Sequence, residues 1–244
     1  MPVEWANFIF TVIAGFLAAI WGFWVWRGER NKEREQERKK RAALYVNPFL
    51  MACEDLQSRL YNILENNGLK PLREHCPDGS YADETLYLVA QYFAWEWCIY
   101  RYSPYAQDSD VIQLTEEIRL AYGTDKLEIG PFCFFRHEQR SLGRLVRERH
   151  EGEFGAEFDV ISFSDFKQRL ALPPLSDSKA IRETLSALRD AQSKDDLKPS
   201  VRKRMARIQT KLVSLLNHIE RKEGITLFHC GDAKKRLTAK DVEA

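Results

Sequence analysis

The sequence predicts a mainly α-helical protein: an N-terminal transmembrane helix followed by a cytoplasmic helical domain. Residues 5–26 form an uncharged, largely apolar run. Further along, apolar residues recur mostly three or four positions apart, which is the spacing of one face of a helix. Only two short segments, 132–135 and 158–163, are candidates for a small two-stranded element. The predicted parts are a membrane anchor (1–26), a charged helical spacer (27–46), a helical domain (47–231) and a basic tail (232–244).

Residues 5–26 have the length and composition of a membrane-spanning helix. At about 1.5 Å per residue, the step from Trp5 to Trp26 rises roughly 31 Å, close to the about 30 Å of a bilayer's hydrocarbon core. Its strongly apolar side chains each favour insertion by about 0.3 to 0.6 kcal/mol. Indole side chains mark both predicted interfaces, with Trp5 at one end and Trp21, Trp24 and Trp26 at the other.

The charges around this run predict its orientation. Only Glu4 precedes it, whereas eight Lys or Arg residues lie within 27–41. A cleaved signal peptide would need positive charge before the run and a small-residue cleavage site after it, and the sequence has neither. By the positive-inside rule the N-terminus lies outside and the remaining chain is cytoplasmic. We therefore expect a single-pass protein of the inner (plasma) membrane, with the lipid bilayer as one partner.

Small residues on one face of this helix suggest self-association. Gly15, Ala19 and Gly22 are spaced by four and three positions, so a second helix could approach closely there. This spacing predicts a homodimer. The alternative is that Gly and Ala are simply frequent in membrane helices.

The charge distribution argues against nucleic acid as a partner. Residues 53–128 hold 14 acidic and 6 basic side chains, a net charge of −8, while residues 129–244 hold 17 acidic and 23 basic ones, a net charge of +6. Because the basic half still carries many acids, we interpret the two halves as complementary parts of one domain.

The cysteines predict a reducing compartment. There are five of them, without CxxC spacing, so no disulfide framework is expected. The dipeptides His75-Cys76 and His229-Cys230 could meet around zinc, but adjacent residues seldom both bind one metal. We therefore predict no metal and no other cofactor.

Segment 27–46 is expected to continue the anchor as a solvated helix, because opposite charges such as Glu35 and Lys39 lie three or four positions apart. It lacks an apolar seam, which is typical of a spacer. Its net charge of +4 also suits anionic lipid headgroups.

Three core helices should follow. Asn47-Pro48 supplies an N-cap and a first-turn proline for a helix ending at Asn66-Asn67-Gly68. Ser80 begins a second helix, apolar on nearly all sides. A third begins near Ser109 and ends at Gly123.

Glu96, inside the second helix, is a candidate for a perturbed carboxylate because it lies between Trp95 and Trp97. Arg101 or Arg119 would be its structural partner, in which case the carboxylate would have no catalytic role.

The segment from residue 130 to residue 170 is the most irregular. An aromatic run (132–135) follows Gly130-Pro131 and precedes a basic helix from Arg136 to about Arg149. The aromatic run is expected to form either a short strand, with which residues 158–163 could pair, or a buried turn. Ser164 can then cap a short helix through Leu170.

The C-terminal part predicts a helical hairpin. Ile181, Leu185 and Leu188 line its first helix, and Lys198-Pro199-Ser200 starts the second. Apolar residues in the second helix recur at intervals of 4, 3, 4, 3 and 4: Val201, Met205, Ile208, Leu212, Leu215 and Ile219. We expect this seam to pack on its hairpin partner and on earlier helices, with pairing between two chains as the alternative.

Candidate site residues are few. No P-loop, dinucleotide, zincin, nucleophile-elbow or EF-hand pattern occurs, so the common nucleotide and hydrolase mechanisms lose their usual support. Arg136 and Arg140 could bind an anionic ligand beside the aromatic run. Alternatively, polar residues of this segment fix the loop by salt bridges and backbone hydrogen bonds.

Two resemblances to known families exist. The pair Arg144 and His150 resembles the Arg-x(4–6)-His signature of HEPN ribonuclease domains, which implies cleavage of an RNA phosphodiester at a dimer interface. The segments NPFLMACEDLQSRLYNIL, YLVAQYFAWEWCIYR, FCFFRHEQRSLGRLV, ISFSDFKQRL and IQTKLVSLLNHIE resemble a group of bacterial proteins with no assigned activity, many with one N-terminal membrane helix. That resemblance covers most of residues 47–220.

We therefore expect a non-enzymatic membrane protein whose helical domain binds or positions a protein partner. The enzymatic alternative is a membrane-tethered, HEPN-like ribonuclease or phosphodiesterase that uses Arg144 and His150. A third hypothesis is sensing of an anionic ligand through Arg136 and Arg140.

Overall fold

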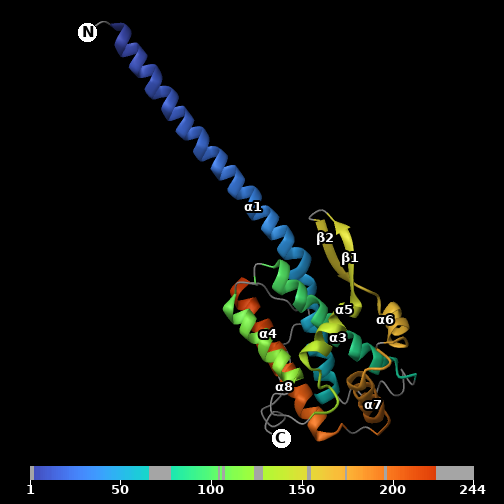
Figure 1. Cartoon of the computed structure of the whole chain (residues 1–244). Coiled ribbons are helices and arrows are strands. Elements are labelled where there is room, and N and C mark those ends of the chain that lie inside the picture. Colours follow the sequence, from blue (N-terminus) through green and yellow to red (C-terminus); the bar gives the residue numbers. More distant parts are fainter. Residues whose placement is uncertain are drawn as a thin grey trace. The chain divides into compact units, whose positions relative to one another are not determined.

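The computed structural model confirms a mainly helical fold with a small antiparallel hairpin (Figure 1). The residues that it describes are 3–65, 78–103, 105, 108–123, 129–152, 155–173, 175–194 and 197–223. The chain divides into two units, Met1–Ala43 and Leu44–Ala244. The predicted tail and the dipeptides His75-Cys76 and His229-Cys230 lie outside the described residues.

Helix α1 (Val3–Glu65) contains the predicted membrane-spanning run (5–26) and the predicted spacer (27–46). Within the first unit, the described side chains from Ile13 to Glu37 are all exposed. Among residues with described side chains, none of the helices combines the length and the apolar character needed to span a bilayer. The side chains of residues 5–12 and of Ala14 lie outside the described part of the predicted span.

Pro48 does not begin a new helix, so the predicted start at Asn47-Pro48 was wrong. Helix α1 continues through Pro48. A proline removes one intrahelical hydrogen bond, but tertiary contacts on both sides of it hold this helix together. Tyr45 stacks on Tyr102 with ring centroids 5.2 Å apart, and Phe49 lies 6.1 Å from Tyr92. Tyr45, at the end of the predicted spacer, is therefore part of the domain core.

Helix α3 (Ser80–Tyr102) is the centre of the domain. It starts at Ser80 as predicted, and most of its residues are buried. It contacts α5, α6, α7 and β2. Helix α5 approaches it most closely at Gly143, where an added Cβ would lie 2.8 Å from the backbone of Phe93. Apolar residues of α1 at helical spacing are also buried: Phe49, Cys53, Leu56, Leu60, Ile63 and Leu64.

Helices α4 (Ser109–Tyr122) and α8 (Pro199–Glu223) lie side by side (Figure 1). They are antiparallel, since Lys222 pairs with Asp108 at one end and Arg204 reaches Gly123 at the other. The predicted apolar seam of α8 is buried along its whole length. It packs on an earlier helix as expected, whereas its hairpin partner α7 (Lys179–Lys194) packs on α3.

A buried arginine closes the end of α4. Arg204 is 1% exposed. Its Nη1 donates to the carbonyl oxygens of Ala121, Tyr122 and Gly123 at 3.0, 3.4 and 2.7 Å. The last carbonyl groups of a helix have no intrahelical partner, so a cation there satisfies them and complements the helix dipole.

The aromatic run 132–135 forms a buried turn, which is one of the two forms expected for it, and it does not pair with residues 158–163 as a strand. Phe132 has a left-handed backbone, with φ of 64°. Its amide donates to Thr184 Oγ1 at 2.9 Å, and the amide of Phe134 donates to the carbonyl of Tyr122 at 2.8 Å. These bonds direct the run onto α4 and α7 instead of along a neighbouring strand.

The two-stranded element forms elsewhere. Helix α5 (Arg136–Val146) ends three residues before the predicted Arg149, and β1 (Arg147–Gly152) follows directly. Strand β1 pairs antiparallel with β2 (Gly155–Val160), Arg147 opposite Val160. The prediction of one basic helix missed this pairing, which depends on contacts between the hairpin and α3.

Helix α6 (Phe163–Leu170) begins one residue before Ser164, so the predicted cap was wrong. Its N-cap is Ser162, whose hydroxyl accepts from the amide of Asp165 at 3.1 Å. Ser162 and Ser164 both lie shortly before Asp165, so either of them could cap the helix. Only the local backbone path determines which serine is the N-cap.

We predict that Arg204→Met lowers the free energy of unfolding by about 3 kcal/mol, because three buried carbonyl groups lose a charged donor. Chemical denaturation of the full chain, followed by circular dichroism, measures this change. The control is Lys203→Met, a partly exposed neighbour, which should change the value by less than about 1 kcal/mol. Equal effects of the two substitutions would contradict the importance of this cap.

Candidate functional site

A buried carboxylate lies at the centre of the domain. Glu96 on α3 is 2% exposed, and its Oε1 lies 2.9 Å from Nε of Arg119 on α4. Burial raises the pKa of Glu96 to about 7, although the attraction of Arg119 opposes this shift. The predicted perturbed carboxylate and its partner Arg119 are thus confirmed.

Weakly acidic side chains surround Glu96. Burial, together with the carboxylate of Glu96, raises the pKa of both Cys53 and Tyr92 well above their ordinary values. Burial also raises the pKa of Tyr122. The hydroxyl groups of Tyr92 and Tyr122 have no hydrogen-bond partner among the described residues. The side chains of Cys53, Tyr92 and Tyr122 are therefore neutral at physiological pH. Together with Glu96 they form a polar cluster within an apolar core.

The burial of Glu96 limits the reactions in which this carboxyl group can take part. A pKa near 7 suits a general acid or base, but such a group must also reach the proton that it transfers. Glu96 is enclosed, and its described charged neighbour is Arg119, which also pairs with Glu116 at 3.5 Å. We interpret Glu96 as a structural link between α3 and α4.

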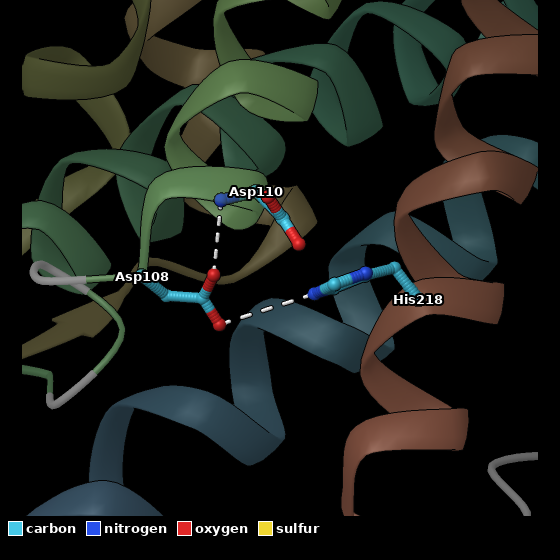
Figure 2. Close-up of side chains that lie close together, drawn as sticks. All are labelled: Asp108, Asp110 and His218. Atoms are coloured by element: carbon cyan, nitrogen blue, oxygen red, sulfur yellow. Dashed lines mark hydrogen bonds and ion pairs between the residues drawn. The ribbon is translucent and has the colours of Figure 1, made fainter.

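A second cluster joins the N-terminus of α4 to α8. Figure 2 shows the carboxylate of Asp108 between the amide of Asp110 and the imidazole of His218. One atom from each of these three side chains lies within 4.8 Å of the others, and two carboxylates with an imidazole could in kind hold a divalent cation. This group is the candidate metal centre among the described residues.

Both oxygens of Asp108 already have partners. Oδ1 accepts from the amides of Asp110 and Val111 at 3.0 and 3.2 Å, as an N-cap does. Oδ2 forms an ion pair with Lys222 and lies 3.9 Å from Nε2 of His218. Burial alone would raise the pKa of Asp108, but its hydrogen bonds from Lys222 and the backbone outweigh that effect and lower it. The ammonium of Lys222 supplies the positive charge that a metal would bring.

We therefore interpret the Asp108 cluster as a clamp that attaches the start of α4 to α8. Sequence reasoning missed it because its members are far apart in the chain. A partial signal was available, since Asp is a favoured N-cap residue and precedes the predicted helix start at Ser109. Nothing in the sequence pairs this cap with His218.

Arg136 and Arg140 both lie on α5 and are exposed, but the structure gives Arg136 a protein partner. It pairs with Glu116 on α4. The neighbouring side chains fix the turn: Glu138 accepts from the amide of Phe135 at 2.8 Å, and Gln139 donates to the carbonyl of Phe134 at 2.8 Å. These contacts support the alternative in which polar residues of this segment fix the loop by salt bridges and backbone hydrogen bonds.

Arg144 and His150 lie on different elements. Arg144 is exposed on α5, whereas His150 is half exposed on β1, with its Nε2 3.7 Å from Glu157 on β2. The helix that carries Arg144 ends at Val146, and His150 follows on the strand β1. Arg144 and His150 therefore do not lie on the same helix.

The anchor residues Gly15, Ala19, Gly22, Trp24 and Trp26 are exposed on α1, and Trp5 lies outside the described side chains. An added Cβ at Gly15 or Gly22 would meet no described atom within 4 Å. The predicted small-residue face is thus open, and dimerisation through it stays a prediction.

Comparison with known proteins gives no match: no family model, no curated protein and no solved structure is similar to this chain. The resemblances to a bacterial membrane-anchored group and to HEPN domains stay predictions.

We predict that Glu96 makes the fold less stable as pH rises from about 4.5 to about 7. In this window the unfolded carboxyl has lost its proton while the folded one retains it, so the unfolding free energy falls with increasing pH. The decrease is at most about 1.4 kcal/mol per pH unit. Glu96→Gln should remove this component, as measured by denaturation at pH 5, 6 and 7.

The matched control is Glu151→Gln, an exposed carboxylate on β1, which should leave the pH dependence as in the unmodified chain. A Glu96→Gln variant with an unchanged pH profile would show that the folded carboxyl titrates normally.

Proposed function

We propose that this chain is a single-pass protein of the inner membrane, N-terminus outside, whose helical domain binds or positions another protein without catalysing a reaction. One observation supports the proposal of a membrane anchor. The exposed residues of α1 between 13 and 26 include nine large apolar side chains: Ile13, Phe16, Leu17, Ile20, Trp21, Phe23, Trp24, Val25 and Trp26. Soluble proteins rarely expose a continuous apolar surface of this kind, so we infer that a bilayer covers it.

The neighbouring residues support this proposal. Residues 27–37 continue the same helix, are exposed and carry charged side chains of both signs. Lys and Arg flanking an apolar segment favour the cytoplasmic side of a membrane. The change from apolar to charged exposed residues at Arg27 is the expected boundary between hydrocarbon and water.

Partner binding is supported by an aromatic–arginine cluster on the domain, which consists of Trp97, Arg101, Tyr102, Arg147 and Phe158. The guanidinium of Arg147 lies 3.5 Å from the ring centroid of Trp97, and that of Arg101 lies 5.4 Å from it. Tyr102 stacks on Phe158 at 5.6 Å.

The members of this cluster are partly or fully exposed. Trp, Tyr and Arg contribute most of the binding energy in protein–protein interfaces, because they offer large contact areas with polar ends. The cluster also attaches the hairpin to α3. A partner that contacts the cluster would therefore contact a rigid surface.

The anchor is tested by alkaline carbonate extraction of membranes. We expect the full chain to stay in the pellet. Phe16→Asp combined with Ile20→Asp should move it to the supernatant, because each charge near the bilayer centre costs about 2.5 to 3.5 kcal/mol. The control is Met51→Asp, which replaces an exposed apolar residue of the domain and should not change extraction. Release of the unmodified chain by carbonate would contradict the anchor.

The partner role is tested by purification from membranes in mild detergent and mass spectrometry. We expect a stoichiometric protein whose yield falls about tenfold in Arg101→Glu, which reverses a charge in the aromatic–arginine cluster. Arg140→Glu, an exposed arginine of α5 outside the cluster, is the control and should leave the yield unchanged. Equal yields from the two variants would contradict the cluster as the binding surface, and RNA that is lost in His150→Ala would favour the ribonuclease alternative.

A further inference from the structure

A cleft of about 290 Å³ lies between α3, α6 and α7. Its apolar wall consists of Leu170, Ala171, Leu175, Ile181 and Leu185, of which Leu170 and Ala171 are the more exposed. The volume is near the lower end of the range for small-molecule sites, which begins at about 300 Å³. The cleft can therefore hold the apolar part of a small molecule.

Positive charge dominates the polar lining of this cleft. Lys167, Arg182 and Arg189 contribute three cations, and Asp83 contributes the one carboxylate among the lining residues. Asp83 is bound to Nη2 of Arg189 at 2.7 Å. The excess positive charge of the described lining favours an anionic ligand and disfavours a cationic one.

The arginine side chains are held in place without using all of their donors. Arg182 donates through Nη1 to the carbonyl of Ser176 at 3.0 Å, and Arg189 is fixed by Asp83. A guanidinium carries five N–H donors in a fixed plane, so each of these side chains retains donors for a further acceptor. A carboxylate matches that geometry with two parallel hydrogen bonds.

We infer that this cleft binds a small amphipathic carboxylate, with its chain against the apolar wall and its head group at Arg182 and Arg189. The apolar wall alone would accept any hydrocarbon, and the arginines alone would accept any anion. Their combination within one cleft selects molecules that carry both features. This inference does not rest on partner binding. Its test in lipid uses the proposed membrane anchor, and failure of the anchor would be recognised separately by the absence of the chain from the nanodiscs.

Octanoate is a suitable probe. The full chain is reconstituted in nanodiscs of neutral lipid, and radiolabelled octanoate is measured by equilibrium dialysis against empty nanodiscs. We expect saturable uptake of one molecule per chain above the empty-nanodisc background. Octylamine, which has the same chain and a positive head group, should show no saturable uptake.

Two variants separate the head-group contact from the apolar contact. Arg182→Gln should weaken octanoate binding about tenfold, because it removes one guanidinium from the cleft. Ala171→Trp, at an exposed lining position that follows α6, should block the cleft without changing its charge. Arg149→Gln, an exposed arginine of β1 outside the cleft, is the control and should bind as the unmodified chain does.

Three outcomes would overturn the inference. The first is the absence of saturable octanoate uptake above the background. The second is unchanged binding in both Arg182→Gln and Ala171→Trp. The third is equal saturable uptake of octan-1-ol, since this would mean that the cleft does not recognise the carboxylate.

Discussion

The packing of the domain depends on how α8 holds α4 at both of its ends. At the C-terminal end, the buried guanidinium of Arg204 satisfies carbonyl groups that a helix leaves without partners. At the N-terminal end, Asp108 caps the first turn and pairs with Lys222 of α8. Between them, Lys211 of α8 pairs with Glu117 at 2.6 Å. These contacts fix the direction and the register of the pair, while the apolar seam of α8 supplies the buried surface.

With α4 fixed, α3 becomes the shared neighbour of the remaining elements. Arg119 of α4 reaches Glu96 of α3, and the amide of Phe134 bonds to the last turn of α4. That second bond directs the aromatic run toward α5, whose Gly143 lies against the backbone of α3. Helix α3 also lines the cleft that lies between α3, α6 and α7. The position of this cleft therefore depends on the contacts between α3 and α4. A small molecule bound there would contact side chains held by several elements.

Helix positions in the domain were largely predictable because each has a strong local signal. Asp108 and Gly123 flank α4 as its N-cap and C-cap, and the spacing of Phe49, Cys53 and Leu56 marks the buried face of α1. Predictions failed or left two alternatives open where distant contacts outweighed the local signal. Pro48 is carried inside a helix because aromatic side chains pack on both sides of it. The aromatic run forms a turn because amides of that run bond to α4 and α7.

The sequence by itself determined the helical class, the apolar stretch followed by basic charge, and the seam of α8, because each follows from local composition and helical period. It also indicated Glu96 and its partner Arg119. Only the tertiary structure decided the β1–β2 pairing, the capping of α4 by Arg204, the cluster of Asp108 with His218 and Lys222, and the arginine-lined cleft. The β1–β2 pairing is local, but residues 147–149 were predicted to continue a helix. Each of the other features joins residues far apart in the chain, and no periodicity or capping rule specifies which distant side chains meet.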